Sequence, residues 1–287
     1  MDVCVALDIG GTKFLAAAAS PEGDVLRTSR AETPRSLPEG LLLLKRMARE
    51  CAGGARILSI GAAIGGPLDW KEGVVSPLHQ PEWREVPLKA LMEREFGCPF
   101  QVDVDTNVAA LGEWRARGRS SRRLLYLTIS TGMGGGFIVD GAVFRGARGE
   151  HPEVAHQSVP WRGAWKSVVC ECGARGCLEA LVSGNGIRRL YGRPASELSD
   201  EEWSEVGHNL GQGLRNLCAI YAPDLIAIGG GVAFGAGEKL LGPARETAAR
   251  ELKLIALPPV EPSVLGYETA LRGGLLLAMD GLAAAED

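Results

Sequence analysis

Short apolar runs bounded by glycine or polar residues alternate with amphipathic stretches in the first part of the chain. Apolar runs of this length predict buried or half-buried strands. We expect such strands over residues 3–7, 14–19, 25–33, 57–64 and 100–104. Residues 38–52 place Leu41, Leu44, Met47 and Cys51 at helical spacing, which predicts an amphipathic helix. A second helix is expected over residues 107–116.

The same order of elements begins again near residue 124. A predicted strand over 124–129 leads into a glycine turn over 132–136 and a strand over 137–139, and Asp140-Gly141 is a hairpin signal. Both halves thus open with strand, glycine turn and strand, which indicates a duplicated unit. Further elements are expected as helices over 201–221, 238–252 and 271–284 and a strand over 225–228. Strands and helices in mixed order predict an α/β fold.

The length and net charge of the chain limit the number of domains and the kinds of partner that we expect. A chain of 287 residues predicts about two domains. We expect a smaller α/β domain over 1–107 and a larger one over 108–271, with a terminal helix over 272–287 packed on the first. The net charge of −4 comes without a basic block, so we expect neither a nucleic-acid nor a membrane partner. No apolar run is long enough to span a membrane and the first residues do not resemble a signal peptide, so a cytoplasmic location is expected.

Three glycine-rich segments follow predicted strands, at residues 8–13, 130–136 and 229–231. Glycine turns at strand ends present backbone N–H groups that bind phosphate oxygens, and Thr12 and Thr131 add hydroxyl donors. A single segment of this kind is more often a tight hairpin turn without a ligand, but three of them weaken that alternative. None matches a P-loop, and none fits the dinucleotide-binding fingerprint.

Two aspartates stand at predicted strand ends. Asp8 precedes the first glycine turn, where it either caps the turn or holds Mg²⁺ through water. Asp105 lies between the strand over 100–104 and the helix over 107–116. It is either a helix N-cap or a general base kept ionised by the helix N-terminus. Local sequence leaves both pairs of alternatives open.

Three of the seven cysteines are clustered, and the other four are scattered through apolar segments, as core thiols usually are. Cys170, Cys172 and Cys177 follow His156, and three cysteines with one histidine form a structural zinc set. The alternative is three unligated thiols in a loop. Four protein ligands leave no open position, so the zinc would be structural. Nearby Glu153 and Glu179 suit hydroxyl groups of a sugar, unless they are solvated surface residues.

These motifs together resemble those of the ROK family of repressors, open reading frames and kinases, and the resemblance covers nearly the whole chain. Residues 8–13 and 131–136 are similar to its two phosphate motifs, 225–231 to the segment near the adenosine, 153–156 to E-x-G-H and 170–179 to C-x-C-G-x-x-G-C-x-E. The resemblance implies a two-domain, actin-like (ribonuclease H-like) fold and an ATP-dependent sugar kinase. It implies ATP contacts from Asp8, Gly10, Gly11, Thr12, Lys13, Thr131, Gly132, Gly134, Gly135, Gly230 and Gly231.

The resemblance also assigns the acceptor side. Asp105 would be the catalytic base, His156, Cys170, Cys172 and Cys177 would hold zinc, and sugar hydroxyls would meet Gly66, Asp105, Glu153, His156 and Glu179. One histidine ring can serve both zinc and sugar. Many members have asparagine where this chain has Val104, so one sugar contact is missing or differently supplied. Ala155 and Ser130 replace family glycines.

We therefore expect phosphorylation of a hexose, on C6 and with glucose favoured, by MgATP. His151-Pro152-Glu153 and the Asp103-x-Asp105 pattern are typical of fructokinase-like members, so fructokinase and N-acetylhexosamine kinase are alternatives. From other classes come a non-catalytic sugar-sensing protein and a ROK transcriptional repressor. The latter is disfavoured because the first phosphate motif begins at Asp8, ahead of which repressors carry a DNA-binding region. We expect a homo-oligomer, a dimer or a tetramer.

Overall fold

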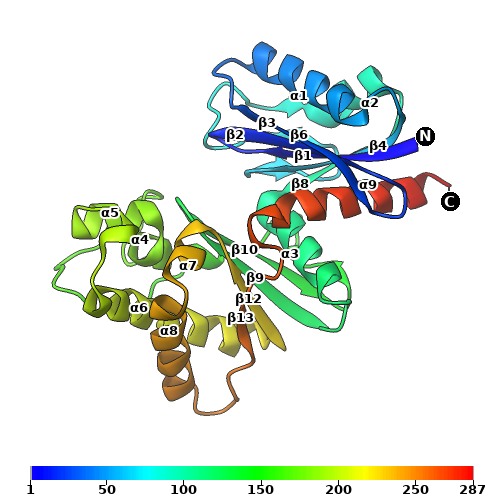
Figure 1. The fold of residues 1–287 in the computed structure, drawn as a ribbon. Helices are drawn as coiled ribbons and strands as arrows, with labels where there is room; N and C mark the ends of the chain where they lie inside the picture. The colour runs from blue at the N-terminus through cyan, green and yellow to red at the C-terminus, as the bar shows by residue number, and fades with distance from the viewer. Residues whose placement is uncertain (1, 287) are drawn as a thin grey trace. The chain divides into compact units, whose positions relative to one another are not determined.

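The computed structural model describes residues 2–286, apart from the side chains of 283–286. The chain forms two compact units (Figure 1). Unit 1 comprises the residues up to Gly112, the segment Gly146–Glu150 and the residues from Glu268 onward. Unit 2 comprises Glu113–Arg145 and His151–Tyr267. The expected boundary after residue 107 stays a prediction.

Unit 1 is built on a five-stranded sheet with the order β3-β2-β1-β4-β8. Its strands are β1 (Asp2–Ile9), β2 (Lys13–Ala19), β3 (Val25–Glu32), β4 (Arg56–Ile64) and β8 (Phe100–Val104). The first three run antiparallel, whereas β4 is parallel to β1 and β8 is parallel to β4. The carboxyl ends of β1, β4 and β8 therefore meet at one edge of the sheet.

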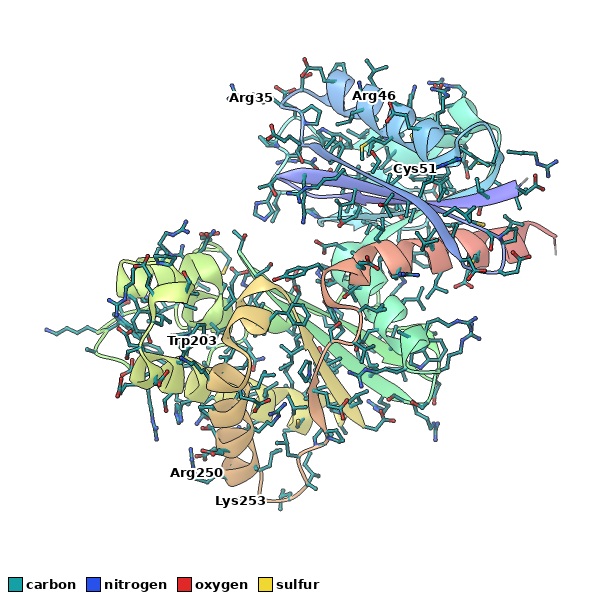
Figure 2. All side chains as sticks on the ribbon, viewed as in Figure 1. Arg35, Arg46, Cys51, Trp203, Arg250 and Lys253 are labelled. Atoms are coloured by element: carbon teal, nitrogen blue, oxygen red, sulfur yellow. The ribbon has the colours of Figure 1, made fainter. Side chains whose placement is uncertain are left out.

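Helices cover both faces of this sheet, which explains why β1 and β4 read as nearly continuous apolar runs. Helix α1 (Leu37–Ala52) packs on β1 and β2, and α9 (Thr269–Glu286) packs on β4 and β1 on the opposite face (Figure 1). On α1, Cys51 is buried in the core while Arg46 extends away from the sheet (Figure 2).

A serine side chain and a glycine set the two ends of α1. The Ser36 hydroxyl accepts a hydrogen bond from the Glu39 N–H, and Gly53 ends the helix in the left-handed conformation.

Between β4 and β8 the chain forms a small sheet and a helix that the sequence pattern did not predict. They are β5 (Leu68–Asp69), β6 (Val74–Val75), β7 (Val86–Pro87) and α2 (Leu88–Phe96).

Unit 2 contains a second five-stranded sheet, with the order β11-β10-β9-β12-β13. Its strands are β9 (Arg123–Ile129), β10 (Met133–Val139), β11 (Ala142–Val143), β12 (Leu225–Gly229) and β13 (Val260–Pro262). An antiparallel hairpin is again followed by parallel neighbours, as in unit 1. This common order agrees with the duplicated unit that the sequence predicted.

The predicted glycine turn over 132–136 is wrong in its extent. The reversal is confined to Ser130–Gly132, closed by a 2.8 Å hydrogen bond from the Ser130 N–H to the Gly132 oxygen, and Gly134, Gly135 and Gly136 lie within β10. The glycines serve close packing: a Cβ on Gly135 would lie 2.7 Å from Val154 Cγ2 and 2.8 Å from the Tyr126 oxygen. The hairpin at Asp140-Gly141 forms, with both residues at positive φ.

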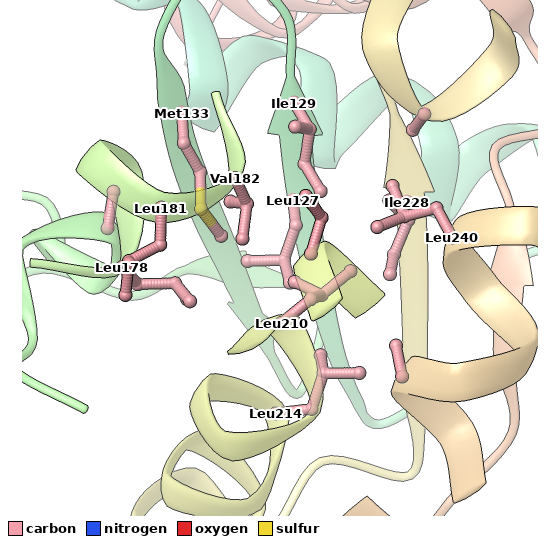
Figure 3. Close-up of a cluster of buried hydrophobic side chains, with 14 of the residues drawn as sticks. Leu127, Ile129, Met133, Leu178, Leu181, Val182, Leu210, Leu214, Ile228 and Leu240 are labelled. Carbon is pink, nitrogen blue, oxygen red and sulfur yellow. The ribbon is translucent and has the colours of Figure 1, made fainter. Parts of the chain in front are cut away.

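Helices pack on the second sheet and form a large apolar core with it. They are α4 (Leu178–Val182), α5 (Gly184–Tyr191), α6 (Asp200–Tyr221), α7 (Gly231–Ala236) and α8 (Glu238–Glu251), with short 3₁₀ turns η1 (Val154–His156), η2 (Ala195–Glu197) and η3 (Gly266–Glu268). Leu210 and Leu214 of α6 pack near Leu127 of β9 and Ile228 of β12 (Figure 3). Gly211 lets α6 approach α8 closely, since a Cβ there would lie 2.6 Å from the Ala244 oxygen.

Within the described part of the chain, no helix is both long and apolar enough to cross a bilayer.

Candidate functional site

A Cys3His cluster lies in unit 2, as the spacing predicted. One donor atom from each of His156, Cys170, Cys172 and Cys177 lies within 4.8 Å of the others. Cys170 Sγ is 3.7 Å from His156 Nδ1, and the sulfurs of Cys172 and Cys177 are also 3.7 Å apart. A tetrahedral zinc with bonds of about 2.3 Å to sulfur requires sulfur–sulfur edges of about 3.8 Å. The donor set and its spacing therefore fit a structural zinc ion.

Glycines shape the loop that brings these ligands together. Gly173 and Gly176 have φ values of 89° and 73°, in the left-handed region that favours glycine. The Gly173 N–H donates to the Cys170 oxygen at 3.0 Å, and the Cys170 N–H donates to the Ala174 oxygen at 2.8 Å. The chain thus folds back between the second and third thiols. This turn places Cys177 directly before α4.

The thiols need a cation to ionise together. Burial raises the pKa of the Cys170 thiol to about 12 and also raises the pKa of Cys177. The pKa of Cys172 is lowered, mainly because the Ala174 backbone donates a hydrogen bond to its sulfur. All the cysteines of the described chain are free, and none of these sulfurs forms a disulfide. Zinc binding at this site must therefore displace protons from buried thiols.

The second nitrogen of His156 faces a carboxylate. His156 Nε2 lies 3.8 Å from Glu153 Oε2, and His151 Nε2 lies 3.5 Å from the other oxygen of Glu153. The Glu153 side chain is 65% exposed. A carboxylate beside a zinc-ligating histidine orients the ring and raises its basicity as a ligand. The structure therefore brings Glu153 and His156 together at the surface of the zinc loop.

Glu179 connects the zinc loop to the second glycine segment. Its Oε2 accepts a 3.1 Å hydrogen bond from the Met133 N–H, and its Oε1 lies 3.5 Å from Cys170 Sγ. A Cβ on Gly132 would lie 3.2 Å from the same Oε2. Because α4 starts immediately after Cys177, the position of Glu179 depends on the folded zinc loop.

The second and third glycine segments lie at neighbouring strand ends. Thr128 of β9 pairs with Gly229 of β12, and Gly230 is so close to β9 that a Cβ there would lie 2.3 Å from the Ile129 oxygen. The second segment is held by α5, whose Asn185 N–H donates to the Thr131 oxygen at 3.0 Å. Unit 2 thus brings Thr131, Gly132, Gly230 and Gly231 to the same edge of its sheet, whereas Gly134 and Gly135 lie within β10, paired with Thr128 and Leu127.

An aromatic pair, the exposed Tyr267 and the half-buried Phe234, lies beside the third segment and was not predicted from the sequence. Tyr267 is 71% exposed and makes an edge contact with Phe234 of α7, with ring centroids 5.3 Å apart. A Cβ on Gly231 would lie 3.8 Å from the Tyr267 ring. No motif marked Tyr267, because it lies far from Gly231 in the sequence and reaches it only through the fold.

Unit 1 brings together the first glycine turn and the two aspartates. The turn is closed by a 3.1 Å hydrogen bond from the Gly10 N–H to the Lys13 oxygen. The pKa of Asp8 is raised to about 7, mainly by burial and also by the negative charge of Asp105, while Lys13 acts in the opposite direction. The two carboxylates are therefore close enough to repel. Carboxylate oxygens are the ligands that Mg²⁺ prefers, so the Asp8 carboxylate beside the glycine turn suits a magnesium ion.

Asp105 is part of helix α3 (Asp105–Ala116), which begins two residues earlier than the prediction over 107–116. Its side chain is exposed and accepts a 2.7 Å hydrogen bond from the Thr106 N–H. The strand end that carries Asp105 belongs to the same sheet edge as Asp8. Asp103, two residues earlier, is instead buried and accepts from Asn107 Nδ2 at 3.1 Å. Of these two aspartates, only Asp105 is exposed to a ligand.

Comparison with known proteins identifies the fold and the family of the chain. A family model described as "ROK family" matches residues 4–280. A ROK hexokinase structure from Thermus thermophilus is 30% identical with a TM-score of 0.82, over 99% of this chain and all of that one. A ROK glucokinase structure from Streptomyces griseus, in complex with glucose and AMPPNP, is 27% identical with a TM-score of 0.81, over 97% and 99% of the two chains. A fructokinase from Zymomonas mobilis is 30% identical over 94% of both. These matches confirm the predicted actin-like α/β fold, and the chain belongs to the ROK family.

Proposed function

We propose that the protein is an ATP-dependent hexose kinase that acts on C6, with glucose as the favoured acceptor. The observation that carries the proposal is the placement of two carboxylates, Asp8 and Asp105, at the same edge of the sheet of unit 1, beside the first glycine turn. One carboxylate then serves the magnesium of MgATP and the other serves the acceptor hydroxyl. Similarity to a glucokinase with glucose and a nucleotide analogue bound supports the same assignment.

In this proposal Asp105 accepts the proton of the sugar hydroxyl as its oxygen attacks the γ-phosphate. Its exposure and its place in the first turn of α3 favour the ionised form, because a helix N-terminus stabilises negative charge. Asp8 and the glycine turns would hold MgATP, with magnesium supplying neutralisation of phosphate charge. Phosphoryl transfer depends mainly on positioning and electrostatic stabilisation of this kind. The zinc site has four protein ligands and therefore supports the loop rather than the reaction.

The acceptor sugar is proposed to meet Gly66, Glu153, His156 and Glu179. Exposed carboxylate oxygens accept hydrogen bonds from hydroxyl groups, and His156 presents Nε2 on the side of Glu153. Glu179 has one oxygen already engaged by the Met133 N–H, so it has less capacity left for sugar. A fructokinase is the second candidate, because His151 approaches the Glu153 carboxylate and a fructokinase is among the relatives.

A coupled assay of ADP release with glucose, fructose, mannose and N-acetylated hexosamines tests the proposal. We expect turnover with at least one hexose and the highest kcat/KM with glucose. Highest kcat/KM with fructose would favour the second candidate. Sugar binding without ADP release for any member of the panel would contradict kinase activity and favour a sugar-sensing protein.

The nucleotide base is proposed to contact the Tyr267–Phe234 pair next to Gly231. Stacking of a base on an aromatic side chain is worth about 1–3 kcal/mol. Tyr267→Ala should therefore raise the KM for ATP about fivefold to a hundredfold and leave the KM for sugar unchanged. Tyr267→Phe should behave as wild type. Steady-state kinetics with each substrate varied in turn checks this, and an unchanged KM for ATP would contradict it.

The raised pKa of Asp8 predicts a pH-dependent stability in the absence of magnesium and nucleotide. Between its ordinary value of 3.8 and about 7, the folded state binds the Asp8 proton that the unfolded chain has released. The free energy of unfolding therefore falls as the pH rises through this interval. A shift from 3.8 to about 7 corresponds to about 4 kcal/mol. The fall attributable to Asp8 is smaller than this, because Asp8 is half-buried and water screens its charge.

Asp8→Asn should remove this component of the pH dependence. Urea unfolding of wild type and variant at pH 5 and pH 8 measures it. We expect the variant to gain stability relative to wild type at pH 8 and to gain little at pH 5. Parallel pH dependence in the two proteins would show that the Asp8 carboxyl titrates normally.

A further inference from the structure

A short loop of unit 1, residues 76–85, crosses the first glycine turn and is firmly held. One nitrogen of Arg84, Nη1, donates to the oxygens of Pro77, Gln80 and Trp83 at 2.8, 3.1 and 3.0 Å. Trp83 is 2% exposed and makes an edge contact with Phe14 of β2, with centroids 6.3 Å apart. The loop is therefore a fixed support, and side chains that it presents to solvent have a defined place.

His79 is presented by this loop between two candidate substrate contacts. A Cβ on Gly11 would lie 2.9 Å from His79 Cβ and 3.7 Å from Cγ, so the histidine packs against the first glycine turn. The neighbouring Leu78 N–H donates to the Gly66 oxygen at 3.1 Å, which ties the loop to the proposed sugar contact. Gly11 belongs to the proposed phosphate side. His79 therefore stands where acceptor and phosphate sides adjoin.

The His79 imidazole is exposed and, within residues 2–282, has no hydrogen bond or ion pair to another side chain. The other three histidines differ: His151 and His156 face Glu153, and His208 Nδ1 is 3.2 Å from the Thr247 hydroxyl. A rigidly supported but unpaired imidazole has both a donor and an acceptor to offer. These two capacities match a sugar hydroxyl, which also donates and accepts.

A hydrogen bond from His79 to the sugar would supply a polar contact that Val104 cannot make. Its apolar side chain ends β8 immediately before Asp105 and offers a sugar no hydrogen bond. We propose that His79 is a sugar-contacting residue that hydrogen-bonds the acceptor near its reacting hydroxyl and helps to select which hexose binds. This inference rests on the proposed function and names a residue for its acceptor site.

Sugar binding without nucleotide tests the proposal. Calorimetric titration of wild type with the best hexose of the panel should give a Kd that His79→Ala raises about tenfold, the effect of one lost hydrogen bond. His79→Gln should recover part of the affinity, because an amide also donates and accepts. Leu78→Ala is the matched control, since that side chain is 72% exposed on the same loop, and it should bind as wild type.

Kinetics separate the contact with sugar from a contact with phosphate. For His79→Ala we expect a raised KM for sugar, an altered order of preference among hexoses and an unchanged KM for ATP. An unchanged sugar Kd, or a defect confined to kcat or to the KM for ATP, would overturn the role of His79 while leaving the proposed kinase intact. Wild-type protein that binds no hexose would overturn both proposals. Binding by wild type without ADP release would overturn only the kinase.

Discussion

Asp105→Asn should lower kcat about 10²- to 10⁴-fold, the range that a positioned general base contributes. The substitution keeps the shape of the side chain and removes its capacity to take the proton of the sugar hydroxyl. Stability and zinc content should be unchanged, because the Asp105 side chain is exposed and lies in unit 1, outside the zinc cluster. Initial rates of ADP release at saturating sugar and MgATP measure the loss of kcat.

Asp69→Asn is the matched control for this substitution. Asp69 is also exposed in unit 1, and its Oδ1 also accepts from backbone N–H groups, those of Lys71 and Glu72. We expect wild-type kcat from it. If Asp105→Asn keeps most of its activity, Asp105 is not the base. A second readout is independent of turnover: removal of the Asp105 charge should lower the pKa of Asp8 from about 7.

Cys177→Ser should abolish stoichiometric zinc binding and lower the melting temperature by about 10 °C or more. Cys177 is fully buried among the core residues of unit 2. A loop that is no longer held by the metal would therefore disturb the packing of that core. Structural zinc contributes directly to folding free energy, and in a unit of this size each 1 kcal/mol shifts the melting temperature by about 2–4 °C. Sugar affinity should fall as well, because Glu179 and His156 depend on the loop.

Metal analysis and differential scanning calorimetry check the zinc prediction. Cys98→Ser is the control: this thiol is half-buried in unit 1, outside the cluster, and its variant should keep one zinc per chain. Purified wild type without stoichiometric zinc, or a Cys177→Ser protein that melts and binds sugar as wild type, would contradict the structural role.

Local patterns predicted the elements that local forces determine. The apolar runs of β1, β4 and β9 and the stripe of α1 were found because their periodicity reflects burial directly. The glycines of β10 were wrongly predicted to form a turn, because a run of glycines usually indicates one. In the structure Gly135 is small because Val154 packs against it, and a larger side chain would collide with Val154. Val154 is distant in the sequence, so local sequence does not show this contact.

The candidate site divides in the same way. The zinc ligands share a short stretch of sequence, and their spacing alone predicted the cluster that the structure forms. The roles of Asp8 and Asp105 were undecided between cap and site, and their mutual electrostatic effect appears only when β1 and β8 share one sheet edge. Tyr267 and His79 carried no motif, because each reaches its glycine through tertiary structure.

Direct detection of the product tests the central claim, that the protein transfers phosphate from MgATP to the C6 hydroxyl of a hexose. Phosphorus NMR of wild type with MgATP and glucose should show glucose 6-phosphate and ADP in equal amounts. The same mixture with 6-deoxyglucose, which lacks the attacking oxygen, should form no sugar phosphate. Sugar phosphate from 6-deoxyglucose, or none from any hexose of the panel, would contradict the account.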